Sequence, residues 1–452
     1  MPARAPENLR HAPKRLRIVI KDLFRIKGLK TSLNNRAYYD LSTPAASTSA
    51  VIELLARDGA HILGMTKLSH MIAREEPLDA VDFHTAFNPR GDGYQSPAGS
   101  SSGSAAAVAT YDWIDCGIGT DTSGSGRRPA LVNGVWQFRP SHDLVDPRSI
   151  VTTYPLFDTP CIFTRGLQPL KLALRSWVPQ TGTINNTNEK GSYEIVYLVD
   201  YLPVANQEQM ALIDGFLSDA ATHLPATIKR ISIREMWKSS YPEGTPDNVD
   251  TYLADLVART FYYAFYHSSD EFRRAYAETH DGKTPYVIPF VQRRWAKGAA
   301  VSNAQNQEAE SKMKVYKEWL LSTVFHQRSI DEGRKQVFIL LPISNVAPNY
   351  RDVVSPSPEQ QSGLDELFLP PILGAADIAV PIGDVPYESR ITGRTEYLPV
   401  VADLIAAPGN DWQLYTMILI RLEGSRRFRR RRYGLVGARY ARSGNSFIRG
   451  LL

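Results

Sequence analysis

The feature that most constrains this chain lies between residues 98 and 129, where two turns rich in serine and glycine flank an alanine-rich run. The turns are Gly99–Ser104 and Thr122–Gly126. Between them, Ala105–Val108 favours a helix, and Cys116–Ile118 has the apolar character of a buried strand. The pattern therefore predicts two serine-bearing turns side by side, one at the start of a helix and one at the end of a strand.

Predicted strands and helices alternate through the first part of the chain. Arg17–Lys21 and Ala60–Met65 are predicted strands, and the amphipathic segment Ser47–Arg57 between them is a predicted helix that Gly59 ends. Ser104 is the expected N-cap of the alanine-rich helix. Further apolar runs predict strands at Tyr193–Pro203, Val337–Ile343 and Ala375–Ile382. This alternation is typical of an α/β fold with a sheet flanked by helices.

The composition changes between about residues 204 and 330, where apolar residues recur at helical spacing, as at Met210, Ile213 and Leu217. An aromatic cluster at residues 261–266 has two interpretations. It lines an apolar pocket, or it forms the core between helices, and the pattern favours the core. The polar stretch Ser302–Lys314 is predicted to be a solvated helix.

The sequence has 452 residues and a formal net charge of +5. Residues 421–452 contain ten arginines and one glutamate, so the preceding residues carry a net charge of −4. The block Arg429–Arg432, with Phe428 and Tyr433 beside it, has the composition of a contact with nucleic acid or anionic lipid. For this Arg-rich tail we favour a disordered extension, or an altered reading at the end of the gene, and we do not expect nucleic acid as a partner.

No run of about 18 apolar residues occurs, and the first twenty residues have no apolar centre. The sequence therefore indicates neither a membrane span nor a secretory signal, and a cytoplasmic location is expected. Cys116 and Cys161 lie in apolar surroundings. Two reduced, packed thiols are the favoured interpretation, although a disulfide between them is the alternative.

The order of these motifs resembles the amidase-signature family. The family combines an apolar strand ending in Lys-Asp with a GGSSGGS turn, an alanine-rich helix and a GTDxGGS turn. The matching residues here are Leu16–Asp22, Ala98–Ser104, Gly119–Ser125, Arg127, Pro129 and Gly134–Val135. The resemblance extends from about Leu16 to Trp177 and, more weakly, from Val337 to Trp412. The segment from Thr392 to Trp412 resembles the C-terminal end of the family in some fungal members.

The resemblance implies an amidase-signature fold, with a central mixed β-sheet flanked by helices and a largely helical inserted region. We expect a single domain over residues 1–420, with a core of residues 16–203 and 334–420. Residues 204–333 then form the helical region that shapes the substrate pocket, and residues 421–452 the tail.

The resemblance also implies acyl-transfer chemistry on a Ser-cisSer-Lys triad. By position, Ser125 is the nucleophile, Ser100 the bridging serine after a cis peptide, and Lys21 the base. A serine hydroxyl needs such a base because it is a weak nucleophile while it is protonated. Independently of the resemblance, an amine at the end of a buried strand is costly to ionise, which makes Lys21 a candidate for a lowered pKa.

The turn after the GTD strand is expected to form the oxyanion hole from the backbone amides of Thr122, Ser123 and Gly124. By resemblance, an ion pair between Asp121 and Arg127 braces it. Three usual glycines of the motif are replaced in this chain, by Ala98, Ser102 and Ser123, and Gly126 replaces an aliphatic residue. Ser123 matters most, because a Cβ in the oxyanion turn disfavours a positive φ.

The expected reaction is hydrolysis of a carboxamide through an acyl-serine intermediate. The expected substrate is a small molecule, such as a secondary metabolite. Two alternatives remain open. One is a catalytically impaired member that binds an amide-like ligand or a partner, and the other is an acyl hydrolase that prefers esters. No GxSxG elbow places a serine with a His and an Asp in the α/β-hydrolase order, so a Ser-His-Asp enzyme is not expected. No phosphate-binding loop or metal-ligand spacing occurs, and neither a cofactor nor a metal is expected. The oligomeric state is left open.

Overall fold

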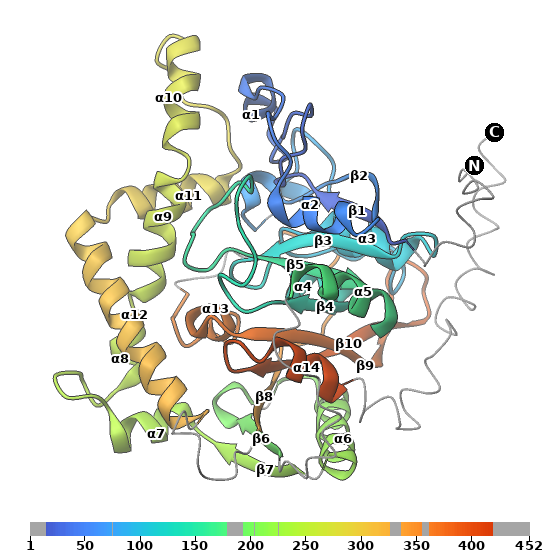
Figure 1. Ribbon diagram of the computed structural model, residues 1–452, viewed down its shortest axis with the longest axis vertical. Coiled ribbons are helices and arrows are strands. Elements are labelled where there is room, and N and C mark those ends of the chain that lie inside the picture. Colours follow the sequence, from blue (N-terminus) through green and yellow to red (C-terminus); the bar gives the residue numbers. More distant parts are fainter. Residues whose placement is uncertain are drawn as a thin grey trace.

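Ten strands form one mixed sheet in the computed structural model, which describes residues 15–74, 76–178, 193–202, 204–224, 226–325, 336–354 and 361–418 (Figure 1). The strand order across the sheet is β2-β1-β3-β5-β4-β9-β10-β8-β6-β7. The strands are β1 Arg17–Lys21, β2 His61–Thr66, β3 Cys116–Asp121, β4 Trp136–Arg139, β5 Thr159–Thr164, β6 Tyr193–Leu198, β7 Ala226–Ile231, β8 Gln336–Pro342, β9 Ala376–Glu388 and β10 Thr395–Ala406.

The two ends of the sheet are parallel and its middle is antiparallel. β1 pairs in parallel with β2 and β3, and β6 pairs in parallel with β7 and β8. From β3 to β8 across the middle, all neighbouring strands are antiparallel. β4 pairs with β9, with Phe138 opposite Ile378, so strands from the two distant parts of the chain share one sheet. This confirms the mixed sheet expected from the sequence.

The predicted strands differ from the observed ones mainly at their ends. Arg17–Lys21 is β1 as predicted, and β2 lies one residue later than predicted. The segment Tyr193–Pro203 is a strand only as far as Leu198 and then makes a short 3-10 turn. The edge strand β7 was not predicted, because ATIKRI is largely exposed and has no continuous apolar run.

The helices cover the sheet and extend beside it. The α-helices are α1 Arg36–Leu41, α2 Ala50–Arg57, α3 Ser102–Thr110, α4 Arg127–Asn133, α5 Leu167–Trp177, α6 Gln207–His223, α7 Ile233–Ser240, α8 Val249–Leu253, α9 Tyr263–His267, α10 Asp270–Thr279, α11 Pro289–Ala299, α12 Asn303–Thr323, α13 Leu369–Leu373 and α14 Asp411–Met417. Short 3-10 helices are η2 His70–Ile72, η3 Pro77–Asp79 and η4 Val199–Tyr201, and η5 Ala258–Tyr262 is a π-helix.

The alanine-rich helix begins earlier than predicted. α3 starts at Ser102 with Ser101 as its N-cap residue, so the expected capping role of Ser104 is wrong. The Ser104 hydroxyl instead donates to the carbonyl oxygen of Ile118 at 2.9 Å and also contacts the Thr66 hydroxyl at 2.7 Å. Ser104 therefore attaches the helix to β3, because α3 packs directly on that strand.

Helices α7–α12 stack beside the sheet, on the left in Figure 1, and form the helical part of residues 204–333. The polar stretch at Ser302–Lys314 lies in α12, which begins with a capping box between Ser302 and Gln305. Its exposed residues agree with the prediction of a solvated helix. α11 packs on both α9 and η5, the two elements that carry the aromatic cluster.

Two further expectations concern single features of the chain. Cys116 and Cys161 are free, buried thiols, as favoured from the sequence. No described helix has the length and apolar character needed to cross a membrane. The Arg-rich tail at residues 421–452 lies outside the described residues, so the interpretation of that segment stays a prediction.

Candidate active site

Lys21 ends strand β1 and is fully buried beneath the first serine turn. Its Nζ donates to the hydroxyl oxygens of Ser100 at 2.7 Å, Ser101 at 2.9 Å and Thr120 at 2.8 Å. Burial lowers the pKa of this amine to about 7, and more distant negative groups only partly oppose that effect. At neutral pH a large fraction of Lys21 is therefore uncharged and able to accept a proton.

The hydroxyl network around Lys21 limits where its proton can come from. The Ser101 hydroxyl donates to the carbonyl oxygen of Thr120 at 2.9 Å, so it acts as an acceptor toward Lys21. A neutral amine has one lone pair and two N–H donors. The hydroxyl that donates to that lone pair must then belong to Ser100 or Thr120.

The turn that carries Ser100 depends on backbone geometry available to glycine. Gly99 has a φ of +47°, and a Cβ at this position would lie 2.5 Å from Cδ of Pro129. The Ser69 hydroxyl donates to the Gly99 carbonyl at 2.7 Å, and the Ser101 amide donates to the Ser125 carbonyl at 3.1 Å. The last bond joins the two serine turns directly, which places Ser100 and Ser125 in one pocket.

The buried side chains of Asp121 and Arg127 stabilise the second serine turn, Thr122–Gly126. The Asp121 carboxylate accepts the backbone N–H groups of Gly124, Gly126 and Arg127 at 2.9, 2.9 and 3.0 Å. Arg127 forms an ion pair with it at 3.0 Å, and both side chains are almost completely buried. Burial opposes ionisation of Asp121, but the charge and hydrogen bonds of Arg127 keep its pKa well below the ordinary value.

The hydrogen bonds to Asp121 also decide which backbone amides of the turn can form the expected oxyanion hole. Because the Gly124 N–H donates to Asp121, it is directed away from the pocket in this structure, and its predicted role has to be corrected. Thr122 and Ser123 remain as the candidates from that expectation, and both line the pocket. The Thr122 hydroxyl is anchored on Asp158, whose carboxylate also accepts the Thr153 amide.

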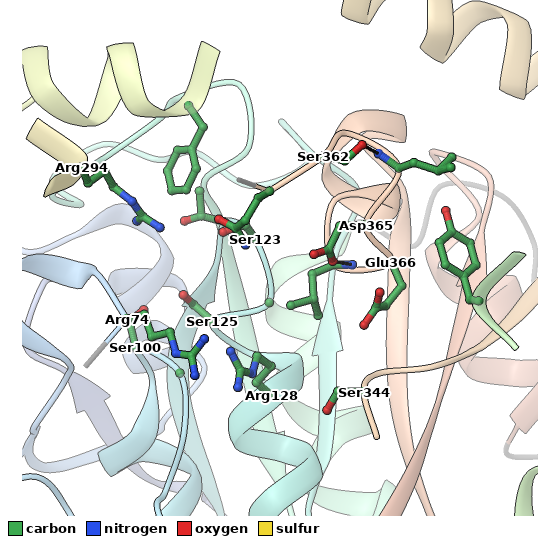
Figure 2. A pocket seen from close by; sticks show the side chains of 18 of the residues that line it. Arg74, Ser100, Ser123, Ser125, Arg128, Arg294, Ser344, Ser362, Asp365 and Glu366 are labelled. Carbon is green, nitrogen blue, oxygen red and sulfur yellow. Dashed lines mark hydrogen bonds between the residues drawn. The ribbon is translucent and has the colours of Figure 1, made fainter. Parts of the chain in front are cut away.

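The pocket has a volume of 550 Å³. It is lined by residues of the two serine turns, the helical region and the segment before α13. Figure 2 shows Ser100 and Ser125 on one side of it, beside Arg74. Eight of its lining residues are arginine, aspartate or glutamate, so it is strongly polar. Opposite the serines lie Asp365 and Glu366, where burial and the neighbouring Asp365 charge raise the pKa of Glu366 to about 7.

Comparisons with known proteins match the part of the chain that carries this site. The family model described as Amidase matches residues 16–190, which contain Lys21 and both serine turns. Over 164 residues the chain is 38% identical to "Amidase 1" of Oryza sativa subsp. japonica, which covers 36% of this chain and 37% of the relative. Residues 16–190 of this chain therefore match the amidase family.

Solved structures show the same fold over nearly the whole chain. A bacterial aryl acylamidase of the amidase-signature enzymes superposes with a TM-score of 0.69 at 19% identity, covering 92% of this chain and 83% of that one. A peptide amidase from Stenotrophomonas maltophilia gives a TM-score of 0.63 at 19% identity, covering 89% and 81%. At these identities the likeness shows the fold alone.

The curated relatives are matched over only part of their length. Aligned segments span between 26% and 37% of those proteins. One of them is named "Translocon at the outer membrane of chloroplasts 64" of Pisum sativum and is 34% identical over 161 residues, 35% of this chain and 26% of that protein. The activity of the whole protein is therefore a matter for proposal.

Two departures from the amidase-signature motif fit the local structure. The positive φ of the second turn falls on Gly124, at +98°, so the Cβ of Ser123 meets no backbone conflict. At position 126 a Cβ would lie 2.8 Å from Sγ of Cys161 and 3.2 Å from Cβ of Asp121. Glycine at 126 therefore allows the turn to sit close to β5 and to Asp121.

Several residues of the site were not singled out from the amidase-signature motifs. Ser101 and Thr120 contact Lys21 and lie within the two motifs, so the motif positions themselves were the available signal. Phe261 is buried and also lines the pocket, so both interpretations of the aromatic cluster apply to it. Arg294 and Glu366 come from segments without a motif, and no sequence signal marked them.

Proposed function

We propose that the protein is an amidase that hydrolyses a carboxamide C–N bond through an acyl-enzyme on Ser125. The observation that carries this proposal is the fully buried Lys21 amine, bonded to the Ser100 hydroxyl at 2.7 Å and with a pKa of about 7. A base with a pKa near the working pH is effective in proton transfer. A purely structural lysine at a strand end would reach solvent or a carboxylate instead.

In the proposed acylation, Ser125 Oγ attacks the amide carbonyl carbon as its proton passes to Ser100 Oγ. Ser100 simultaneously gives its own proton to the neutral Lys21 Nζ. The tetrahedral oxyanion is stabilised by the amides of the second turn, with Thr122 and Ser123 as the proposed donors. Removal of one such donor typically lowers the rate about 10²–10³-fold.

Collapse of the tetrahedral intermediate breaks the C–N bond. The leaving nitrogen takes a proton from Ser100, which is replenished from Lys21, so a neutral amine departs. Water then attacks the acyl-Ser125 ester while the same relay accepts its proton, and collapse returns that proton to Ser125 and releases the carboxylic acid. The lysine ends each cycle neutral.

A binding role without turnover is the second candidate. It is supported by the relative whose name describes a translocon component rather than an amidase. In that case the pocket holds an amide-like ligand or a partner, and the serine turns keep their shape without catalysing a reaction. A third option is an acyl hydrolase that uses the same three residues but prefers esters. We propose a small molecule as substrate and the cytoplasm as location, on the sequence grounds given above.

Turnover of matched amides and esters tests these options. We expect the purified protein to hydrolyse acyl anilides, and Ser125→Ala to abolish release of the aniline. Ser218→Ala removes an exposed serine of α6 and serves as the matched control, with unchanged turnover expected. Turnover of esters alone would replace the amidase proposal with the esterase one, and no turnover of either class by folded protein would support the binding role.

A further inference from the structure

Four arginines line the pocket, and three of them face carboxylates. Arg74 pairs with Glu76 at 3.0 Å. Arg234 contacts two aspartates, Asp250 at 2.7 Å and Asp200 at 3.4 Å. The charge of Arg128 is balanced at longer range by Glu76, Asp365 and Glu366.

The fourth arginine, Arg294, has no such compensation. Within the described ranges, no carboxylate lies at ion-pair distance from its guanidinium, although the side chain is only 8% exposed. Its side-chain hydrogen-bond partner is the hydroxyl of Tyr262, which is a neutral group. A buried charge without a counter-ion is costly, so its retention at a pocket wall calls for an explanation.

Aromatic rings surround this guanidinium. The centroids of Phe261, Phe290, Tyr262 and Phe265 lie 4.8, 4.8, 5.0 and 5.1 Å from its central carbon. Cation–π contacts stabilise the positive charge but do not neutralise it. They also leave N–H donors of the planar guanidinium available, and Figure 2 shows the side chain directed from α11 into the pocket.

The backbone fixes this position closely. Gly298 lies one helical turn after Arg294 on α11, and a Cβ there would lie 2.1 Å from the carbonyl oxygen of Tyr262. α11 therefore approaches the π-helix η5 as closely as a glycine permits. That contact sets Arg294 against the rings of Phe261 and Tyr262, so the arginine is held in place before any ligand arrives.

We propose that Arg294 binds a negatively charged group, a carboxylate, at the far end of the amide substrate. This inference rests on the proposed function, because it names the substrate class of the same pocket. Guanidinium groups recognise carboxylates through paired N–H donors. The adjoining rings of Phe261 and Phe290 line the pocket as well, which favours an apolar or aromatic spacer between the amide and the carboxylate.

Binding to Ser125→Ala protein, measured by titration calorimetry, tests the proposal without any turnover. The probes are three size-matched pairs, each an anionic carboxylate and its neutral carboxamide: benzoate and benzamide, 4-acetamidobenzoate and 4-acetamidobenzamide, and 4-(acetamidomethyl)benzoate and its carboxamide. A buried charge-assisted hydrogen bond corresponds to about a ten- to hundredfold change in affinity. We expect the carboxylate of at least one pair to bind more tightly by such a factor.

Substitutions in the Ser125→Ala background assign that preference to a residue. We expect Arg294→Met to abolish it and Arg294→Lys to keep only part of it, because lysine retains the charge without the planar fork. Arg293→Met, which removes an exposed arginine of the same helix, should leave it unchanged. Should Arg294→Met fail to fold by circular dichroism, Arg294→Gln decides in its place.

Two results would overturn the inference. One is equal affinity for carboxylate and carboxamide in all three pairs. The other is a carboxylate preference that survives Arg294→Met, in particular one lost instead in Arg128→Met. Because hydrolysis is not measured, a protein that binds the carboxylate through Arg294 but turns over no amide would contradict only the proposed function.

Discussion

A fully buried lysine beside three hydroxyl groups is the residue on which the proposed chemistry depends. Within the described ranges, Lys21 has no carboxylate at ion-pair distance, and its neighbours are Ser100, Ser101 and Thr120. A hydroxyl stabilises an ammonium group less than a carboxylate would. Desolvation therefore dominates and lowers the pKa of Lys21 to about 7. The neutral amine is the form that can accept the proton of Ser100.

The pH dependence of acylation follows from that pKa. The rate should rise with pH through about 7 and then level off, because deprotonation of Lys21 produces the active base. Lys21→Met should lower the rate about 10²–10⁴-fold and remove the rise. The measurement is the initial rate of aniline release between pH 5 and 9. The exposed Lys67→Met is the control, and a pH profile that persists in Lys21→Met would assign the base elsewhere.

Asp121 gives a second prediction at this scale. Its carboxylate accepts three backbone amides of the second turn and pairs with the buried Arg127. Asp121→Asn leaves the guanidinium without its closest counter-ion, so we expect a loss of about 3–5 kcal/mol in the free energy of unfolding. Urea denaturation measures it.

The matched control for Asp121→Asn is Glu318→Gln, which removes the carboxylate of an exposed pair with Lys314 at 4.0 Å. We expect less than about 1 kcal/mol there, since exposed pairs contribute little. Equal losses in the two variants would show that the buried pair does not hold the turn.

At the scale of elements, the approach of α3 to the sheet brings the serine turns together. A Cβ on Gly103 would lie 2.4 Å from the carbonyl oxygen of Lys67. One on Gly117 would lie 2.7 Å from the carbonyl oxygen of Ser104, and one on Gly119 would lie 2.8 Å from Oγ of Ser101. Glycine on both the helix and the strand therefore permits the short distances from Lys21 to Ser100 and Ser101.

Gly119→Ala tests this packing. The added methyl group must displace Ser101 or Phe163, so we expect a loss of about 1–3 kcal/mol in stability and slower acylation. Gly64→Ala is the control in β2, because nothing lies within 4 Å of the added Cβ. Thermal unfolding and aniline release measure the two effects. A Gly119→Ala protein as stable and active as Gly64→Ala would mean that α3 has room to move.

Elements whose signal is local could be predicted from the sequence, and the others could not. β1 is a continuous apolar run, and its bounds agree with the prediction. The start of α3 was wrong because three serines compete for the first turn, and only the contact with β3 decides which one lies inside the helix. β7 was missed because its side chains are exposed, and pairing with β6 alone makes it a strand.

The candidate site likewise contains residues that the sequence could predict and residues that it could not. Lys21, Ser100 and Ser125 could be named because each lies in a motif, whereas the roles assigned to them stay predictions. Gly124 was misassigned because a sequence does not show which way an amide points, and here Asp121 accepts it. Arg294 could not be found, because its neighbours in the pocket come from distant segments of the chain.

At the scale of the whole molecule, a buried charge cluster joins the two parts of the sheet. Arg127 on α4 lies 3.8 Å from Asp377 on β9 and 3.8 Å from Asp403 on β10, in addition to Asp121 on β3. Burial raises the pKa of Asp377 to about 7, although Arg127 opposes the shift. Burial raises the pKa of Asp403 as well, and the negative charge of Asp377 raises it further.

This cluster predicts how stability depends on pH. A carboxyl with a raised pKa in the folded state binds its proton more tightly there than in the unfolded chain, where the pKa is about 3.9. Its contribution is therefore complete in acid and is lost as pH rises from about 4 to 7. Asp377→Asn should reduce that loss, measured by urea denaturation at pH 5 and 7.5.

The exposed Asp58→Asn is the control for the cluster, and it should keep the wild-type difference between the two pH values. Asp403 still titrates in the Asp377→Asn protein, so part of the difference should remain there. A difference in Asp377→Asn equal to that of Asp58→Asn would show that Asp377 is already ionised in the folded protein at pH 5.

Labelling of the intact protein with a fluorophosphonate probe, followed by peptide mapping by mass spectrometry, tests most directly whether Ser125 is the nucleophile. We expect one adduct, on Ser125, absent from Ser125→Ala and strongly slowed in Lys21→Met. An adduct that persists in Ser125→Ala, or folded wild-type protein that takes up no probe, would contradict acyl transfer through this serine.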